Sequence, residues 1–118
     1  MTTIRTIQDI QLELMRRASF NDFDGPGVVE SLLAHHALWE AALMDTDNGP
    51  MYHLRDLSAN YWNVSTLHII ARNGRERELE ALARTWGADE VAWHPAGNEK
   101  LGGRGGNGST SVLRVWWD

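Results

Sequence analysis

Histidines and carboxylates are the side chains of this sequence whose types could do chemistry. Its 118 residues hold five histidines and 16 aspartates and glutamates, and they hold no cysteine. His68 and His94 fall in two segments that are predicted to be strands, and Asn73 begins a predicted helix between them. A right-handed crossover would place both histidines toward the C-terminal ends of parallel strands, where ligands collect in open sheets. The pair could then serve acid–base chemistry or, beside the helix start at Asn73, anion binding.

A glycine-rich stretch at residues 95–109 is the second candidate feature, because it holds six of the eleven glycines. Within it, residues 103–108 spell G-x-G-x-x-G and include Arg104. Dinucleotide binding requires a helix directly after such glycines, but residues 110–117 have the pattern of a strand. We therefore expect a long hairpin connection and no cofactor. Arg104 remains a candidate ligand-binding residue, because loops of this length are often functional.

Metal-ligand spacing occurs once, at His36 and Glu40, which are four residues apart in a helix predicted over 28–44. Two such side chains project from one helix face and can supply two metal ligands. No other predicted helix offers a third ligand. Asp22, Asp24 and Gly25 resemble part of a calcium loop. The first and last positions of that loop, which require aspartate and glutamate, fall on Phe20 and Ser31. The prediction is that no metal is bound, with His36 and Glu40 as a weak alternative.

Catalytic signatures are absent from the sequence. It contains no G-x-S-x-G or S-x-x-K pattern, no P-loop and no H-E-x-x-H. The lack of cysteine also excludes thiol nucleophiles, disulfides and thiolate metal sites. These observations favour a binding protein over an enzyme.

The net charge of −5 is concentrated in the first part of the chain. Residues 1–50 hold eight acidic and three basic side chains. Such a field repels nucleic-acid phosphates and speeds the encounter with a basic partner. We therefore expect a protein partner and no nucleic acid, with Glu30, Asp45 and Asp47 on the interaction surface.

The elements that must position these residues follow from hydrophobic periodicity. A helical hairpin is predicted over 1–48: a helix over 4–18, capped by Thr6 with Asp9, then the helix over 28–44. In the first helix, one apolar stripe is expected to face the core. It comprises Ile4, Ile7, Ile10, Leu14, Met15 and Ala18. Residues 49–60 form a connection that is either a short strand or a short helix.

A βαββ unit is predicted over 61–118. It consists of a strand over 62–71, a helix that starts at Asn73 and ends before Gly87, and strands over 89–94 and 110–117. The fold class is therefore α+β, in one domain, with a small three-stranded mixed sheet. Trp116 and Trp117 must point to opposite faces of the last strand, and an exposed tryptophan would mark a partner surface.

The expected function is non-enzymatic binding of a protein by a small acidic protein. One alternative is a small-molecule or anion-binding domain, or an enzyme, that uses His68 and His94 under the glycine-rich loop. Another is a structural protein that self-associates, with a homodimer left open. No apolar run approaches the ~20 residues of a membrane span, so no membrane partner and a cytoplasmic location are expected.

Overall fold

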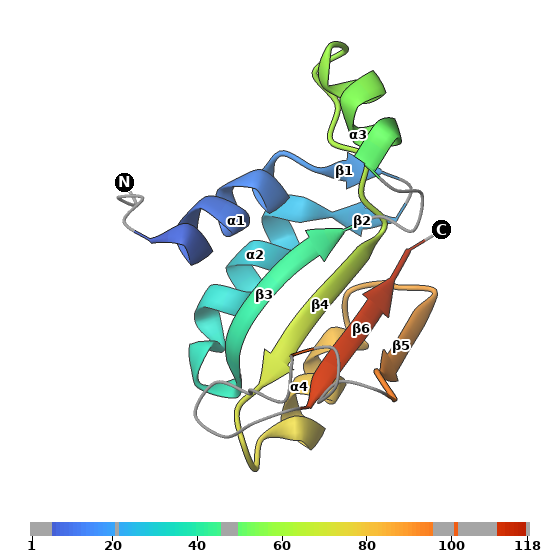
Figure 1. Cartoon of the computed structure of the whole chain (residues 1–118). Coiled ribbons are helices and arrows are strands. Elements are labelled where there is room, and N and C mark those ends of the chain that lie inside the picture. The colour runs from blue at the N-terminus through green and yellow to red at the C-terminus, as the bar shows by residue number, and fades with distance from the viewer. Residues whose placement is uncertain (1–5, 21, 46–49, 96–100, 102–110, 118) are drawn as a thin grey trace.

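The fold is α+β, as predicted, with four α-helices and a four-stranded antiparallel sheet in the residues described (Figure 1). The computed structural model describes residues 6–20, 22–45, 50–95, 101 and 111–117. Arg104 and Asp47, two of the predicted site residues, lie outside this range. In chain order the elements are α1 (Ile7–Arg16), β1 (Ser19–Phe20), β2 (Phe23–Asp24), α2 (Gly25–Ala34), a 3₁₀ turn (His36–Leu38), β3 (Trp39–Asp45), α3 (Pro50–Leu57), β4 (Thr66–Ala71), α4 (Glu76–Ala83), β5 (Glu90–Trp93) and β6 (Val112–Trp116).

The main sheet has the strand order β3-β4-β6-β5, and every neighbouring pair is antiparallel. The prediction of a three-stranded mixed sheet is therefore wrong in strand number and in direction. Strands β4 and β5 run parallel to each other, but β6 lies between them and hydrogen-bonds both. Because β5 and β6 are consecutive strands, they pair with each other, and β6 then takes the place beside β4 that the predicted crossover gave to β5.

The second predicted helix is shorter than expected, which is the largest error in the sequence interpretation. Helix α2 ends at Ala34, and residues 39–45 form strand β3 at one edge of the sheet. Alanine, leucine and methionine in this segment favour a helix, but pairing with β4 decides its conformation. Trp39 reinforces the turn, because its buried indole donates a 2.8 Å hydrogen bond to the carbonyl of Leu32.

The core lies on one face of the sheet, where α2 and α4 pack (Figure 1). The sheet residues that face these helices are almost completely buried, and they alternate along each strand. They are Ala42, Met44, Leu67, Ile69, Ala71, Leu113 and Val115. Helices α2 and α4 contribute the buried side chains Val28, Val29, Leu32, Leu79 and Ala83.

Four of the six tryptophans donate their indole hydrogen bonds within the fold. Trp39 donates to Leu32, Trp86 to the Ser31 hydroxyl, Trp93 to the Glu80 carboxylate, and Trp117 to the carbonyl of Trp86. Indole N–H groups that leave water need such acceptors. The high tryptophan content therefore reflects how the helices attach to the sheet, and it does not by itself indicate a partner surface.

Helix α1 begins as predicted but turns a different face to the core. Thr6 and Asp9 form the expected capping box, with bonds of 3.0 and 3.1 Å. The buried residues of α1 are Leu12 and Met15, whereas Ile7, Ile10 and Leu14 are 79%, 49% and 37% exposed. The helix lies along the edge strand β3 and against α2, so its Leu12 side meets the core. Of the predicted stripe, Met15 and Ala18 are buried as expected, Ile7, Ile10 and Leu14 remain exposed, and Ile4 lies outside the described residues.

The turn between β4 and α4 also differs from the prediction. Arg75 occupies the N-cap position of α4, and the N–H of Gly74 donates to the Glu76 carboxylate at 2.6 Å. Asn73 therefore does not cap this helix. The longest helices, α1 and α2, have ten residues each, and within the described ranges no helix is long and apolar enough to cross a membrane.

Candidate functional site

The sheet face opposite the α2–α4 layer carries several apolar side chains, although no helix among the described residues lies over it (Figure 1). Cross-strand pairs place Leu43, His68 and Arg114 in one row, and Ile70 and Val112 in the next. An antiparallel sheet with one solvated face normally carries polar side chains there. Leu43 is instead 45% exposed, and Ile70 is half-buried. We call the face that carries Leu43, His68, Ile70, Val112 and Arg114 the open face of the sheet.

A pocket of about 290 Å³ lies on the open face, beside the edge strand β3. Strands β3, β4 and β6 form its floor, the first turns of α1 form one wall, and Leu101 contributes from the segment between β5 and β6. The residues that line it are Ile7, Gln8, Gln11, Ala41, Ala42, Leu43, His68, Ile69, Ile70, Leu101 and Val112. Eight of these eleven residues are apolar and three, Gln8, Gln11 and His68, are polar, so the pocket suits a hydrophobic group.

His68 is the one titratable side chain among the described residues that line the pocket. Its cross-strand neighbour Arg114 forms a 2.7 Å ion pair with Glu90, on the side of β6 away from the pocket. Catalysis by a histidine requires a second group within hydrogen-bond reach of the reacting atoms. The other described residues that line the pocket carry no carboxylate or hydroxyl side chain.

The residues predicted to form a histidine site are not brought together. The His94 N–H donates to the carbonyl of Val112, so β6 separates His94 from His68 by two strand spacings, about 10 Å. His68 lies in the middle of β4 rather than at its C-terminal end, and Asn73 lies exposed in the following turn. Only His68 belongs to the pocket.

His36 and Glu40, the alternative pair of metal ligands, were expected to share one helix face, and the structure does not place them on one. His36 lies in the 3₁₀ turn with its ring 5.3 Å from that of Trp39, and Glu40 lies in β3, at a shift in strand register. The two side chains therefore do not share a helix face. Among the described residues, no group of three or more histidines and carboxylates is placed to hold a metal ion. One buried carboxylate oxygen of Glu40 has no hydrogen-bond partner there.

The predicted interaction residues fall in several places. Trp117 is 1% exposed, with its ring 4.6 Å from Phe23, so it belongs to the core and not to a surface. Trp116 lies half-buried on the open face. Glu30 is exposed on α2 and pairs with Arg16 at 2.7 Å, and Asp45 lies exposed at the end of β3. Strand β6 has a neighbour on both sides, so it cannot mediate self-association by edge pairing.

Sequence reasoning missed most of the pocket. Leu43 was placed in a helix, and Ile7 was expected in the core. Gln8 carried no signal, yet its side-chain amide bonds both backbone groups of Ala42: Nε2 donates to the carbonyl at 2.7 Å, and Oε1 accepts from the N–H at 2.8 Å. These bonds fix the wall of the pocket to its floor.

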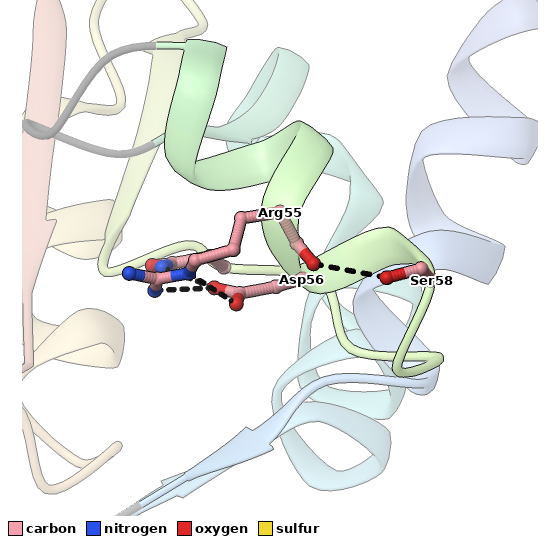
Figure 2. Close-up of polar contacts among 4 residues, drawn as sticks. Arg55, Asp56 and Ser58 are labelled. Atoms are coloured by element: carbon pink, nitrogen blue, oxygen red, sulfur yellow. Dashed lines mark hydrogen bonds and ion pairs between the residues drawn. The ribbon is translucent and has the colours of Figure 1, made fainter.

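Helix α3 is a second exposed apolar surface, and it extends beyond the end of the sheet (Figure 1). None of its residues is buried, and Met51, Leu54 and Leu57 are 71%, 63% and 58% exposed. Its C-terminal end is held by polar contacts, as Figure 2 shows for Arg55, Asp56 and Ser58. The Asp56 carboxylate accepts bonds of 2.7 and 2.9 Å from Arg55 and one of 2.8 Å from Asn63.

The pKa of Asp56 is expected below its ordinary value, because the bonds from Arg55 and then from Asn63 favour the charged carboxylate. Because the pKa of Asp56 is lower in the folded than in the unfolded state, its charged carboxylate stabilises α3 at pH values above the unfolded-state pKa. This stabilisation is lost as the pH falls through the folded-state pKa. Carboxyl-carbon NMR titration of Asp56 should therefore show a low pKa, and Asn63→Ala should raise it. An Asp56 that titrates identically in both proteins would contradict this assignment.

No protein-family model, curated protein or solved structure matches this chain.

Proposed function

We propose that this chain is a protein-binding domain that holds an apolar anchor side chain of its partner in the open-face pocket. The single observation that carries the proposal is this pocket of about 290 Å³, lined mainly by apolar residues on a sheet face over which no helix lies in the described part of the chain. Interface hot spots are anchors that fill such desolvated pockets near the centre of a contact.

The surroundings of the pocket support a macromolecular partner. Ile7, Ile10 and Leu14 lie on one face of α1 next to the pocket and remain exposed, and Leu43 borders it on β3. Large contiguous apolar patches of this kind mark interaction sites on proteins whose remaining surface is polar. A partner that covers α1 and β3 together would remove all four side chains from water.

A small apolar molecule is the second candidate occupant, favoured by the lining residues Leu101 and His68, which add an apolar and a polar contact to those from α1 and β3. Small-molecule sites also use a few convergent polar groups to orient the ligand, and their volumes are roughly 300–1,000 Å³. The polar groups here are His68, Gln11 and Gln8, and Gln8 already bonds Ala42. The pocket is therefore better suited to one anchor side chain than to a whole ligand.

Leu43→Asp is expected to weaken partner binding by roughly 30-fold or more, as loss of a hot spot does. The charge enters the pocket border, and because Leu43 is 45% exposed, the fold should be retained. The assay selects binders of the wild-type protein from a displayed random-peptide library and measures their affinity for the variant by calorimetry. Leu33→Asp on α2 is the matched control, because Leu33 is 39% exposed and does not line the pocket.

The proposal predicts that selected peptides carry a large apolar residue and lose affinity for Leu43→Asp but not for Leu33→Asp. A library that yields no binder, or binders that tolerate Leu43→Asp, would contradict it. A binding response limited to free C6–C10 hydrocarbons, followed by methyl shifts in NMR spectra, would favour the small-molecule candidate instead.

A further inference from the structure

Strand β3 is an edge of the main sheet, and one of its outward peptide groups is already occupied by a side chain. Its inner side bonds β4, so the N–H and C=O of Ala42 point away from the sheet. The side-chain amide of Gln8 hydrogen-bonds both groups, at 2.8 Å to the N–H and 2.7 Å to the C=O. A side-chain amide has the donor and acceptor of a peptide group. Gln8 therefore holds the position that a neighbouring strand would take.

Exposed edge strands pair readily with other extended chains, and proteins normally block them. At one end of β3 the shift in register between Trp39 and Ala41 disrupts the regular ladder. Ala42 follows this shift in register, and its hydrogen bonds with Gln8 cover the edge of β3 where the strand forms part of the pocket floor. The blocked peptide group and the pocket thus lie side by side.

Among the described contacts, the two bonds of Gln8 join the first turns of α1 to β3. The side chains of Ile7 and Ile10 are 79% and 49% exposed, so both are already partly in water where the helix begins. The firm anchors come later in the helix, where Leu12 and Met15 are buried and Arg16 pairs with Glu30 at 2.7 Å. The beginning of α1 can therefore leave the edge while its end remains attached.

We propose that the partner binds as an extended segment that adds to β3 as a fifth strand and displaces Gln8 from Ala42. This inference rests on the proposed function, since the anchor in the pocket is a side chain of the same segment. In strand addition, backbone hydrogen bonds provide affinity, and pockets for alternate side chains provide specificity. Gln8 then acts as an internal competitor that keeps the edge closed until such a segment arrives.

N-methylation of each backbone nitrogen of a library-selected peptide tests the mode of binding. If the peptide adds to β3, methylation should lower affinity roughly tenfold at every second position and little at the positions between, because a strand's N–H groups alternate in direction. Equal effects at all positions would overturn the inference. If N-methylation had equal effects but Leu43→Asp still abolished binding, the proposed function would survive and only strand addition would be overturned. Failure to select any peptide would overturn both the strand addition and the proposed function.

Gln8→Ala tests the competitor itself. The same peptides should bind this variant roughly tenfold more tightly, because two competing hydrogen bonds are gone. In the free protein, the Ala42 amide should exchange with solvent faster than in the wild type. Glu13→Ala is the control, because Glu13 lies on the same helix, pairs with Arg16 and Arg17, and does not line the pocket. An Ala42 amide that is equally protected in Gln8→Ala, together with unchanged peptide affinity, would overturn the inference.

Discussion

Trp117→Ala should lower the free energy of unfolding by about 3–5 kcal/mol, the usual cost of removing a buried tryptophan. The side chain is 1% exposed, stacks edge-on against Phe23 at 4.6 Å, and donates to the carbonyl of Trp86. The substitution leaves a large cavity and also frees a carbonyl that has lost its donor. Because small domains are stable by only about 5–15 kcal/mol, urea denaturation should show a large shift of the midpoint.

Trp116→Ala is the matched control, one residue away on the opposite face of β6. Trp116 is half-buried and faces the open side of the sheet, so its removal should cost about 1 kcal/mol. Equal losses in the two variants would contradict the assignment of the two faces, on which the position of the pocket depends.

Gly25→Ala should destabilise the fold by about 3 kcal/mol or more, above the usual range for adding a methyl group to a packed core. Gly25 begins α2 directly after β2 and is buried. A Cβ at this position would collide with the backbone carbonyl oxygens of Met15 and Ala18. Backbone atoms cannot change rotamer to make room, so the chain that joins α1 to α2 would have to move.

Gly74→Ala provides the comparison for thermal unfolding. Gly74 has a φ of +87°, but a Cβ there would meet nothing within 4 Å. The cost is then backbone strain alone, about 1 kcal/mol. If Gly25→Ala were as mild as Gly74→Ala, the close approach of α2 to the end of α1 would be incorrect.

Local signals in the sequence predicted the parts of the fold that local interactions determine. The capping box at Thr6 and Asp9 forms as expected, and α4 buries Leu79 and Ala83. Strand periodicity puts Leu67 and Ile69 on one face of β4, and Leu113 and Val115 on one face of β6, and these residues are fully buried. Each of these features depends on residues a few positions apart.

Non-local pairing determined the rest. Residues 39–45 have helix-forming side chains, and only pairing with residues 66–71 makes them a strand. The strand order could not be read from the sequence, because whether β6 joins β4 depends on contacts between distant segments. The prediction of a site at His68 and His94 assumed that β4 and β5 were neighbours, whereas β6 lies between them.

The pocket was inaccessible to sequence reasoning for the same reason. Its lining comes from residues 7–11, 41–43, 68–70, 101 and 112, and each piece looks ordinary alone. The apolar pattern of α1 was recognised, but periodicity cannot tell which of two adjacent apolar faces packs inward. The stripe that was predicted to face the core includes Met15, which is buried, but also Ile7 and Ile10, which are exposed, whereas the buried Leu12 was not in it.

Mapping a library-selected peptide onto the protein by backbone and methyl NMR shifts tests the central claim most directly. Binding in the open-face pocket predicts that the largest changes fall on Leu43, His68, Ile70 and Val112, with changes at Gln8 where α1 meets β3. Changes confined to the exposed residues of α3, with the pocket residues unmoved, would contradict the claim.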